Sequence, residues 1–221
     1  MADQVKHGPV AYPRRQQRAQ RTRRAVLDAA RRLFVAEGYG STSIKAIAEE
    51  AGVAVQTVYV IFTNKPAILS EVLDVAIAGD DERVVVNARE WMEPVFSAPT
   101  GAGRLRAYAA AVRRIHEGAG EVFAVIARSA GTDAEVAELH ELAEARRRAG
   151  AASVVAAVED VAPLRPGLAT EAAIDLVWLW NGPLVHHHLT VAAGWSADAY
   201  EKWLADTFVR DLLDEAPTDR G

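Results

Sequence analysis

The sequence predicts an all-α protein with a small N-terminal domain of short helices and a larger C-terminal helical domain. Apolar residues recur at helical spacing along most of the chain, whereas the alternation expected of β-strands is almost absent. Glycine and proline divide the chain into segments of helical length. The many alanines suit closely packed helices, so these observations together favour the all-α class.

Composition excludes several classes of protein. The 221 residues are 50% hydrophobic and 25% charged, which suffices for one ordinary core or two small ones. The absence of cysteine excludes disulfides, thiolate metal sites and cysteine nucleophiles. No run of 18 uncharged apolar residues occurs, and the first 30 residues are arginine-rich. We therefore expect no membrane span, no secretion signal and a cytoplasmic location.

Charge is divided unevenly along the chain. Residues 1–65 hold 11 Lys or Arg against 5 Asp or Glu, whereas residues 66–221 hold 14 against 25, which gives a formal net charge of −5. A basic N-terminal part joined to an acidic remainder is typical of a nucleic-acid-binding module attached to a part that does not bind nucleic acid.

The N-terminal elements are predicted from glycine, proline and apolar spacing. Residues 1–20 contain two prolines and little apolar content, so they predict a flexible basic arm. From Arg21 the apolar residues follow one helical face until Gly38, a residue that suits the position after a helix end.

Two short helices separated by a glycine follow. Ser43 and its hydroxyl-bearing neighbours can cap a helix over Ile44–Ala51, which Gly52 ends. A further short helix is predicted over Val55–Phe62, and Asn64 can cap a fourth helix. A short helix, a glycine turn and a second short helix are typical of a helix-turn-helix, whose second helix enters the DNA major groove.

The remaining chain predicts helices joined by short breaks. They lie near residues 80–97, 103–117, 120–130, 133–161, 168–180, 184–193 and 196–214. Glycine, proline and asparagine supply the breaks.

A resemblance to a known family is carried by the first 70 residues. The run TSIKAIAEEAGVAVQTVYVIFTNKPAIL (Thr42–Leu69) resembles the DNA-binding region of the TetR family of bacterial regulators. The preceding RRAVLDAARRLFVAEGYGST is similar to the family's first helix and the turn after it. About a dozen positions agree in register over about residues 21–70.

The resemblance implies a domain organisation and a function. It implies a flexible basic arm over 1–20, a three-helix helix-turn-helix DNA-binding domain over 21–66, and a C-terminal helical ligand-binding and dimerisation domain over 67–215. The chain would be a ligand-responsive transcriptional regulator. It would act as a repressor, released from a palindromic operator by a small apolar or amphipathic molecule, with an activator or a ligand-independent regulator as alternatives.

The resemblance also implies particular DNA contacts. The side chains concerned are Thr42, Ser43, Gln56, Thr57, Tyr59 and Lys65. Gln56 and Thr57 would meet base edges in the major groove, where a glutamine amide can bind adenine N6 and N7. The other four would contact phosphate, and Lys65 would do so beside the positive end of the fourth helix.

Several positions depart from the family's pattern. Ala54 replaces the usual serine or threonine cap, Ile61 stands where a histidine is common, and Val55 and Val60 are apolar. An interaction module that has lost DNA binding is therefore an alternative. The N-terminal arginines either reach the DNA backbone or minor groove, or form a solvated tail. These arginines are Arg14, Arg15, Arg18, Arg21, Arg23 and Arg24.

A homodimer is implied by the same resemblance, because a palindromic operator requires a twofold axis. The Gly-Trp-Ser-x-x-x-Tyr-x-x-Trp-Leu pattern after residue 193 resembles the final helix of family members. Trp203, Leu204, Phe208 and Leu212 are expected to face the partner. Burial within the chain is the alternative for all four.

A ligand cavity among the middle helices is implied as well. The candidate residues are Trp91, Met92, Phe96, Tyr108, Val112, Phe123, Ile126, Trp178 and His186. Each of them is alternatively a simple core residue. The apolar balance favours an uncharged or amphipathic effector over a phosphorylated one.

Metal binding and catalysis are not expected. His186–His188 are consecutive, so on a helix they point about 100° apart and cannot bind one ion together. We expect His186 to be buried and no cofactor to be present. His140, Glu141 and Glu144 could imitate a metal site, but we expect a solvated face in which Glu144 pairs with Arg148. No phosphate-binding glycine loop and no Ser–His–acid arrangement occurs, so the chain is not predicted to be an enzyme.

Overall fold

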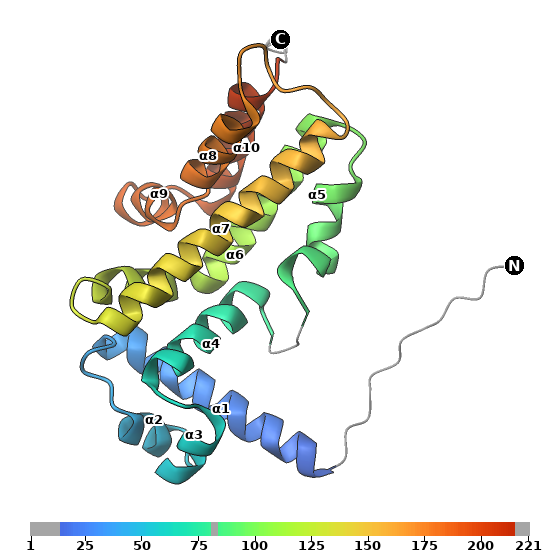
Figure 1. Ribbon diagram of the computed structural model, residues 1–221. Coiled ribbons are helices and arrows are strands. Elements are labelled where there is room, and N and C mark those ends of the chain that lie inside the picture. The colour runs from blue at the N-terminus through green and yellow to red at the C-terminus, as the bar shows by residue number, and fades with distance from the viewer. Residues whose placement is uncertain (1–13, 81–83, 215–221) are drawn as a thin grey trace, which may run out of the picture. The chain divides into compact units, whose positions relative to one another are not determined.

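The computed structural model describes residues 14–80 and 84–214 and contains helices but no strands in those ranges (Figure 1). The all-α fold class is therefore confirmed. The chain divides into two compact units, with the boundary between Leu69 and Ser70, inside one helix.

The α-helices are α1 (Arg14–Glu37), α2 (Ile44–Glu50), α3 (Val55–Ile61), α4 (Lys65–Ala78), α5 (Glu93–Ser97), α6 (Gly101–Ser129), α7 (Ala134–Glu159), α8 (Thr170–Trp180), α9 (Pro183–His187) and α10 (Ala197–Leu212). Two 3-10 turns precede α5, and a π-helical turn over His188–Ala192 follows α9.

The N-terminal unit is built around the apolar face of α1. Val26 and Phe34 are buried there, together with Ile47 of α2 and Val58 of α3. Burying a side chain of this size stabilises the fold by about 1.5–3 kcal/mol relative to leaving it exposed. Gly52 adopts a φ of 68°, which permits the sharp turn between α2 and α3.

Helix α1 begins earlier than the sequence predicted. It starts at Arg14, so residues 14–20, which were expected to belong to the flexible arm, are helical. Arginine, glutamine and alanine dominate this stretch, and all three are good helix formers. The rest of the predicted arm, residues 1–13, lies outside the described residues.

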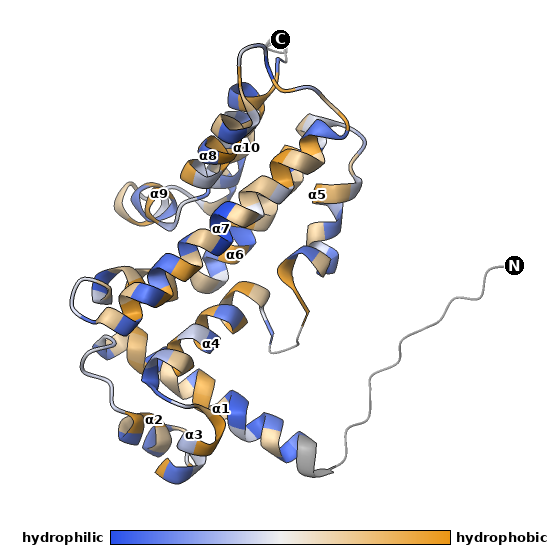
Figure 2. Cartoon of the chain, in the orientation of Figure 1, coloured by the Kyte–Doolittle hydropathy of each residue, from blue (hydrophilic) through white to orange (hydrophobic). Residues whose placement is uncertain are grey.

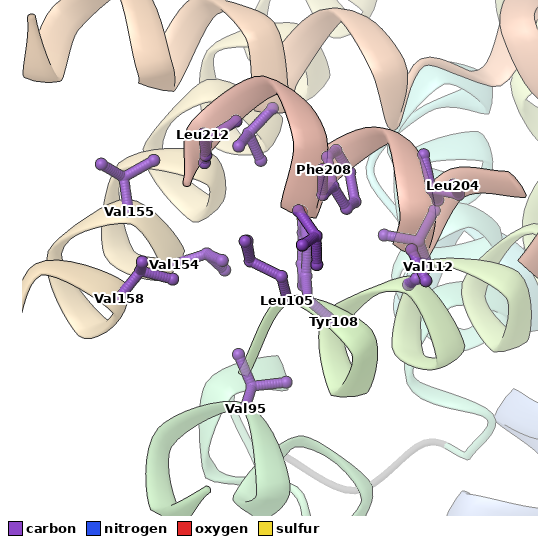
Figure 3. Packing of buried hydrophobic residues seen from close by; sticks show 14 of the residues in the cluster. Val95, Leu105, Tyr108, Val112, Val154, Val155, Val158, Leu204, Phe208 and Leu212 are labelled. Atoms are coloured by element: carbon purple, nitrogen blue, oxygen red, sulfur yellow. The ribbon is translucent and has the colours of Figure 1, made fainter. Parts of the chain in front are cut away.

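The C-terminal unit has one main apolar core, to which α6, α7, α8 and α10 contribute. Figure 3 shows Leu105 and Tyr108 of α6, Val155 of α7 and Phe208 of α10 around this core. Near the end of α4, a Cβ atom on Gly118 would lie 2.5 Å from the carbonyl oxygen of Ala76. Only glycine allows the backbones of α4 and α6 to approach so closely.

Three predicted helices differ from the observed ones. The segments expected at 103–117 and 120–130 form one continuous helix, α6, because the glycines between them serve packing and do not end the helix. The helix expected over 80–97 is reduced to α5, since Pro94 is tolerated only in a first helical turn. The helix expected over 184–193 becomes α9 and the π-helical turn.

Candidate nucleic-acid interface and ligand site

The outer face of α3 carries Gln56, Tyr59 and Val60, which are exposed. Tyr59 is 56% exposed and Val60 is 86% exposed, whereas Val58 and Phe62 are buried on the opposite side. Residues three and four apart share one helical face, so the buried pair fixes which side chains α3 presents to solvent. Thr57 lies at the edge of that face and is half-buried.

The turn before α2 contains two of the predicted phosphate contacts. The Thr42 hydroxyl donates to the carbonyl oxygen of Gly38 at 2.9 Å, and the Thr42 backbone N–H donates to that of Tyr39 at 3.3 Å. Thr42 is only 1% exposed. Its hydroxyl is directed into the protein, which corrects the expectation that it reaches phosphate.

Lys65 is held by the same turn. Its ammonium donates to the carbonyl oxygens of Tyr39 and Thr42, at 2.9 and 3.1 Å, and lies 4.0 Å from the centre of the Tyr39 ring. Lys65 therefore links the start of α4 to the turn before α2. Its predicted contact with phosphate stays a prediction.

Ser43 is exposed, and its side-chain oxygen accepts a hydrogen bond of 3.0 Å from the backbone N–H of Ala46. This bond is the cap that the sequence predicted for α2. The hydroxyl proton of a capping serine can be donated outward. Ser43 therefore keeps a hydroxyl at the surface that can meet a phosphate oxygen.

Basic side chains accompany these residues on α1 and α2. Figure 2 shows hydrophilic residues over much of the N-terminal part of α1, where Arg21 and Arg24 lie. The guanidinium of Arg23 lies over the Phe62 ring at 5.3 Å, so this arginine packs on the N-terminal unit. The exposed Lys45 on α2 was not predicted as a DNA contact. It forms an ion pair of 3.7 Å with Glu49, and the spacing of four residues between the two was visible in the sequence.

The predicted ligand residues are only partly brought together. Met92, Tyr108 and Val112 are buried in the main core, and Trp91, Phe96 and Trp178 are partly buried against it. Phe123 and Ile126 are buried farther along α6, outside this core. His186 is half-buried and stacks on His116 with ring centres 4.6 Å apart.

A chain of polar contacts adjoins this core. His116 Nε2 lies 2.9 Å from the backbone carbonyl oxygen of Asn181, and the Asn181 side-chain amide donates to the Tyr108 hydroxyl at 2.6 Å. Arg147 donates to the side-chain oxygen of Asn181 and to the backbone carbonyl oxygen of Trp178. Sequence reasoning missed His116, because a single polar residue on an apolar helix face carries no periodic signal. It used Asn181 only as a break after a helix.

Glu144 neutralises Arg147. The two side chains form an ion pair of 2.7 Å, and Glu144 also accepts a hydrogen bond from the Trp178 indole at 3.2 Å. The expected pairing of Glu144 with Arg148 is therefore wrong. Arg148 instead pairs with Glu171 and Asp175, because α8 lies beside α7.

Burial keeps the polar groups of this site neutral. Burial is the largest of the effects that together lower the pKa of His116 to about 3; the neighbouring His186 and Arg147 act in the same direction, and the hydrogen bond to the Asn181 carbonyl opposes them. Burial also raises the pKa of Tyr108 and that of Tyr200 above the ordinary tyrosine value. A neutral His116 donates Nε2–H to Asn181, which leaves Nδ1 as an acceptor.

We expect the free energy of unfolding to fall as the pH is lowered from 7 to 5. The pKa of His116 is about 3 in the folded chain against 6.5 for an ordinary histidine, so between these values the unfolded chain binds the extra proton. Stability present above about pH 6.5 is then lost at about 1.4 kcal/mol per pH unit. Denaturant titrations of the protein and of His116→Gln at pH 5, 6 and 7 measure this. Equal slopes in both proteins would exclude His116 as the source.

The predicted dimer contacts need correction. Leu204, Phe208 and Leu212 are fully buried in the core of their own chain, because α10 packs its apolar face on α6. They are therefore not available to a partner. Trp203 is partly buried, and its ring contacts those of Trp180 and Trp195 edge-on.

Exposed apolar side chains of this unit lie elsewhere. They include Leu179 on α8, Leu184 on α9, and Val191 and Trp195 just after it. Within residues 14–80 and 84–214, no three or more His, Cys, Asp or Glu side chains are arranged to hold a metal ion. No helix in the described part of the chain is long and apolar enough to cross a membrane.

Comparisons with known proteins concern first the N-terminal unit. Residues 26–72 match the sequence model of a family described as bacterial regulatory proteins, tetR family. No curated protein matches the chain. A match to regulatory proteins agrees with the expectation that the chain is not an enzyme.

Solved structures resemble the chain over most of its length. NalD of Pseudomonas aeruginosa, the secondary repressor of the MexAB-OprM multidrug efflux pump, is 22% identical with a TM-score of 0.68, over 90% of this chain and 100% of that one. FadR of Bacillus subtilis, solved with stearoyl-CoA, is 16% identical with a TM-score of 0.67, over 84% and 97%. A proposed transcriptional regulator of Saccharomonospora viridis, solved with choline, is 18% identical with a TM-score of 0.65, over 89% and 100%. At these identities the similarity establishes the fold.

Proposed function

The chain is a member of the TetR family of bacterial regulators through its residues 26–72, and on this premise we propose that it is a dimeric, ligand-responsive repressor. The observation that carries the proposal is the outer face of α3. Gln56, Tyr59 and Val60 project from it, while Val58 and Phe62 anchor the helix from behind. This is the arrangement that a recognition helix needs to enter a major groove.

The proposed DNA contacts divide by role. Gln56 and Thr57 meet base edges, and Ser43, Tyr59 and Lys65 contact or position the phosphate backbone. The basic residues of α1 add a sequence-independent attraction. This division separates affinity from sequence preference, so the two can be tested by different substitutions.

The proposed dimer forms through the C-terminal unit. Leu179, Leu184 and Val191 are exposed apolar side chains there, and a twofold interface buries such residues more readily than charged ones. Trp203, the one predicted contact that is not fully buried, lies next to Trp180 at the end of α8. Sedimentation of the purified protein tests the dimer, and a monomer at micromolar concentration would contradict it.

The proposed effector is a small apolar or amphipathic molecule bound in the C-terminal unit. Similar folds have been solved with choline and with stearoyl-CoA, and NalD is named a repressor. The effector needs only to bind the DNA-free conformation more tightly than the DNA-bound one. Helix α4 runs without a break from Lys65 to Ala78, across the boundary between the units, so it can couple them.

Selection of binding sites from random duplex DNA tests the DNA-binding role. At near-physiological salt the full chain is expected to enrich a palindrome with half-sites about one helical turn apart or a multiple of it. A folded dimer that enriches no sequence would contradict the proposal. It would instead favour an interaction module, for which the apolar Val60 on the outer face of α3 would be the first residue to examine.

Replacing Gln56 with alanine is expected to relax sequence preference. The glutamine amide is exposed on α3, and the loss of a two-bond contact with adenine costs about 1–3 kcal/mol of discrimination. Fluorescence anisotropy with the selected operator and with a scrambled duplex measures the change. Equal losses on both duplexes would show that Gln56 does not contact bases.

A further inference from the structure

Buried polar groups without a hydrogen-bond partner within the described chain include Nδ1 of His116 and the hydroxyls of Tyr200 and Thr207, all in the C-terminal unit. The rings of His116 and Tyr200 lie close together. His116 is 4% exposed and Tyr200 is 0% exposed. Buried polar side-chain atoms nearly always have a partner, and an unpaired one costs about 1–3 kcal/mol. Both groups therefore indicate a partner that is not part of the chain.

The two groups belong to one site. The rings of His116 on α6 and Tyr200 on α10 are 6.4 Å apart, edge to face. His186 stacks on His116 and meets the Tyr200 ring edge-on at 4.8 Å. The site thus brings residues of α9 and α10 onto α6, which lies much earlier in the sequence.

Hydrogen bonding fixes which groups donate and which accept. His116 donates Nε2–H to the backbone carbonyl oxygen of Asn181, so its Nδ1 carries a lone pair that needs a donor. Asn181 is itself held by the Tyr108 hydroxyl and by Arg147. The Tyr200 hydroxyl can donate or accept. The site therefore presents an acceptor at His116 and a donor at Tyr200.

The charges around the site argue against an ionic ligand. Arg147 is already paired with Glu144, so its charge is compensated. Burial keeps His116 neutral, with its pKa lowered to about 3, and it raises the pKa of Tyr200. An anion would find no free positive charge here, and a buried unpaired ion is costly. A neutral group avoids that cost.

The nearby side chains are mainly aromatic. The Phe123 ring lies 6.0 Å from the His116 ring, and the Trp203 ring lies 6.1 Å from that of Tyr200. The Tyr108 ring, next to Asn181, packs against Phe208 at 5.7 Å. A ligand that reaches the two polar groups therefore places an apolar body against aromatic rings.

We propose that His116 and Tyr200 bind an uncharged ligand with a hydroxyl group on an apolar body, a phenol or an alcohol. Its O–H donates to Nδ1 of His116, and its oxygen accepts from the Tyr200 hydroxyl. This inference rests on the proposed function, because it takes the ligand to be the effector of the regulator. It narrows the chemical class of the effector from apolar or amphipathic molecules to neutral hydroxyl compounds. Neither residue was predicted from the sequence as a ligand contact.

Calorimetry without DNA tests the ligand class. The probes are para-alkylphenols from phenol to 4-octylphenol, each with its methyl ether, which cannot donate, and with the matching para-alkylbenzoate, which is anionic. At least one phenol is expected to bind about tenfold or more tightly than its ether and its benzoate, because Nδ1 of His116 stays unpaired with the ether and the benzoate charge stays uncompensated. If no phenol binds more tightly than its ether, a buried water satisfies the two groups and the proposal is overturned.

Two variants test the residues. His116→Gln can keep the donor toward Asn181 while removing the Nδ1 acceptor, and Tyr200→Phe removes only a hydroxyl with no partner in the chain. Each variant is expected to weaken binding of the tightest-binding phenol about tenfold. His116→Gln should leave binding of the methyl ether unaffected, because the ether has no proton to donate to Nδ1, whereas Tyr200→Phe also removes the donor to the ether oxygen. His140→Gln on α7 is the matched control for His116→Gln and should bind the phenol as the parent protein does.

The variant outcomes are decisive in either direction. Parental phenol affinity in both variants would overturn the assignment, and thermal unfolding of each variant shows that it is folded. If Tyr200→Phe does not fold, His116→Gln alone decides. The calorimetry uses no DNA, so this test and the operator selection can fail separately. If the protein binds a phenol more tightly than its ether but selects no operator, the ligand site is supported and the proposed regulator is contradicted. If the protein selects an operator but binds no phenol more tightly than its ether, the regulator is supported and the ligand site is contradicted.

Discussion

Replacing Phe208 with alanine is expected to lower the free energy of unfolding by about 3–5 kcal/mol. The Phe208 ring is fully buried and packs against Tyr108 in the core shared by α6 and α10. Truncation removes buried apolar surface and leaves a cavity that the surrounding helices fill only in part. Urea denaturation monitored by circular dichroism measures the change.

Val85→Ala is the matched control for this prediction. Val85 is 73% exposed, so its loss should alter the free energy of unfolding by no more than about 0.5 kcal/mol. If Phe208→Ala instead dissociated the dimer and left the stability of each chain unchanged, Phe208 would belong to the interface, as the sequence first suggested. The comparison thus separates a core residue from an interface residue.

Replacing Lys65 with alanine is expected to destabilise the N-terminal unit and to weaken binding to every DNA sequence. The ammonium makes two hydrogen bonds to backbone carbonyl oxygens and contacts the Tyr39 ring. Hydrogen bonds to a charged group are each worth about 1.5–3 kcal/mol, so we expect a loss of about 2–3 kcal/mol for this partly exposed side chain. Thermal unfolding and DNA titrations at several salt concentrations measure both effects.

Lys202→Ala provides the control for a lysine whose ion pair is exposed. Lys202 pairs with Asp206 one turn along α10, and its loss should change stability by less than about 0.5 kcal/mol. If Lys65→Ala were as stable as the parent protein, and its DNA affinity depended less on salt by the equivalent of about one phosphate contact, the role of Lys65 in linking α4 to the turn before α2 would be contradicted. This result would identify Lys65 as a direct phosphate ligand instead.

The sequence predicted best what local rules determine. The Ser43 cap and the positive φ of Gly52 are local features, and the structure has both where the sequence placed them. The helices α2 and α3 follow from them within one residue at each end. The same rules predicted a helix end near Gly118, because the close approach to the Ala76 backbone that requires glycine there is a contact between helices, which no local pattern records.

The candidate site was harder to predict, because its geometry depends on long-range packing. An apolar stripe on α10 is equally suited to a core or to a partner, and only the position of α6 decides that Leu204 and Leu212 are buried in their own chain. The Thr42 hydroxyl turned inward for a similar reason, since the Gly38 carbonyl is close. His116 and Tyr200 became notable only once their burial and missing partners were known.

The contact between Gly118 and Ala76 has an evolutionary consequence. A side chain at position 118 would collide with backbone, which cannot move aside as a flexible side chain can. We therefore expect related sequences to keep glycine here while neighbouring positions on α6, such as Val112 and Phe123, diverge as ligand preference drifts. Glycine inside a helix costs about 1 kcal/mol relative to alanine. Every related protein that keeps the close approach of α4 and α6 would therefore also keep this cost to its stability.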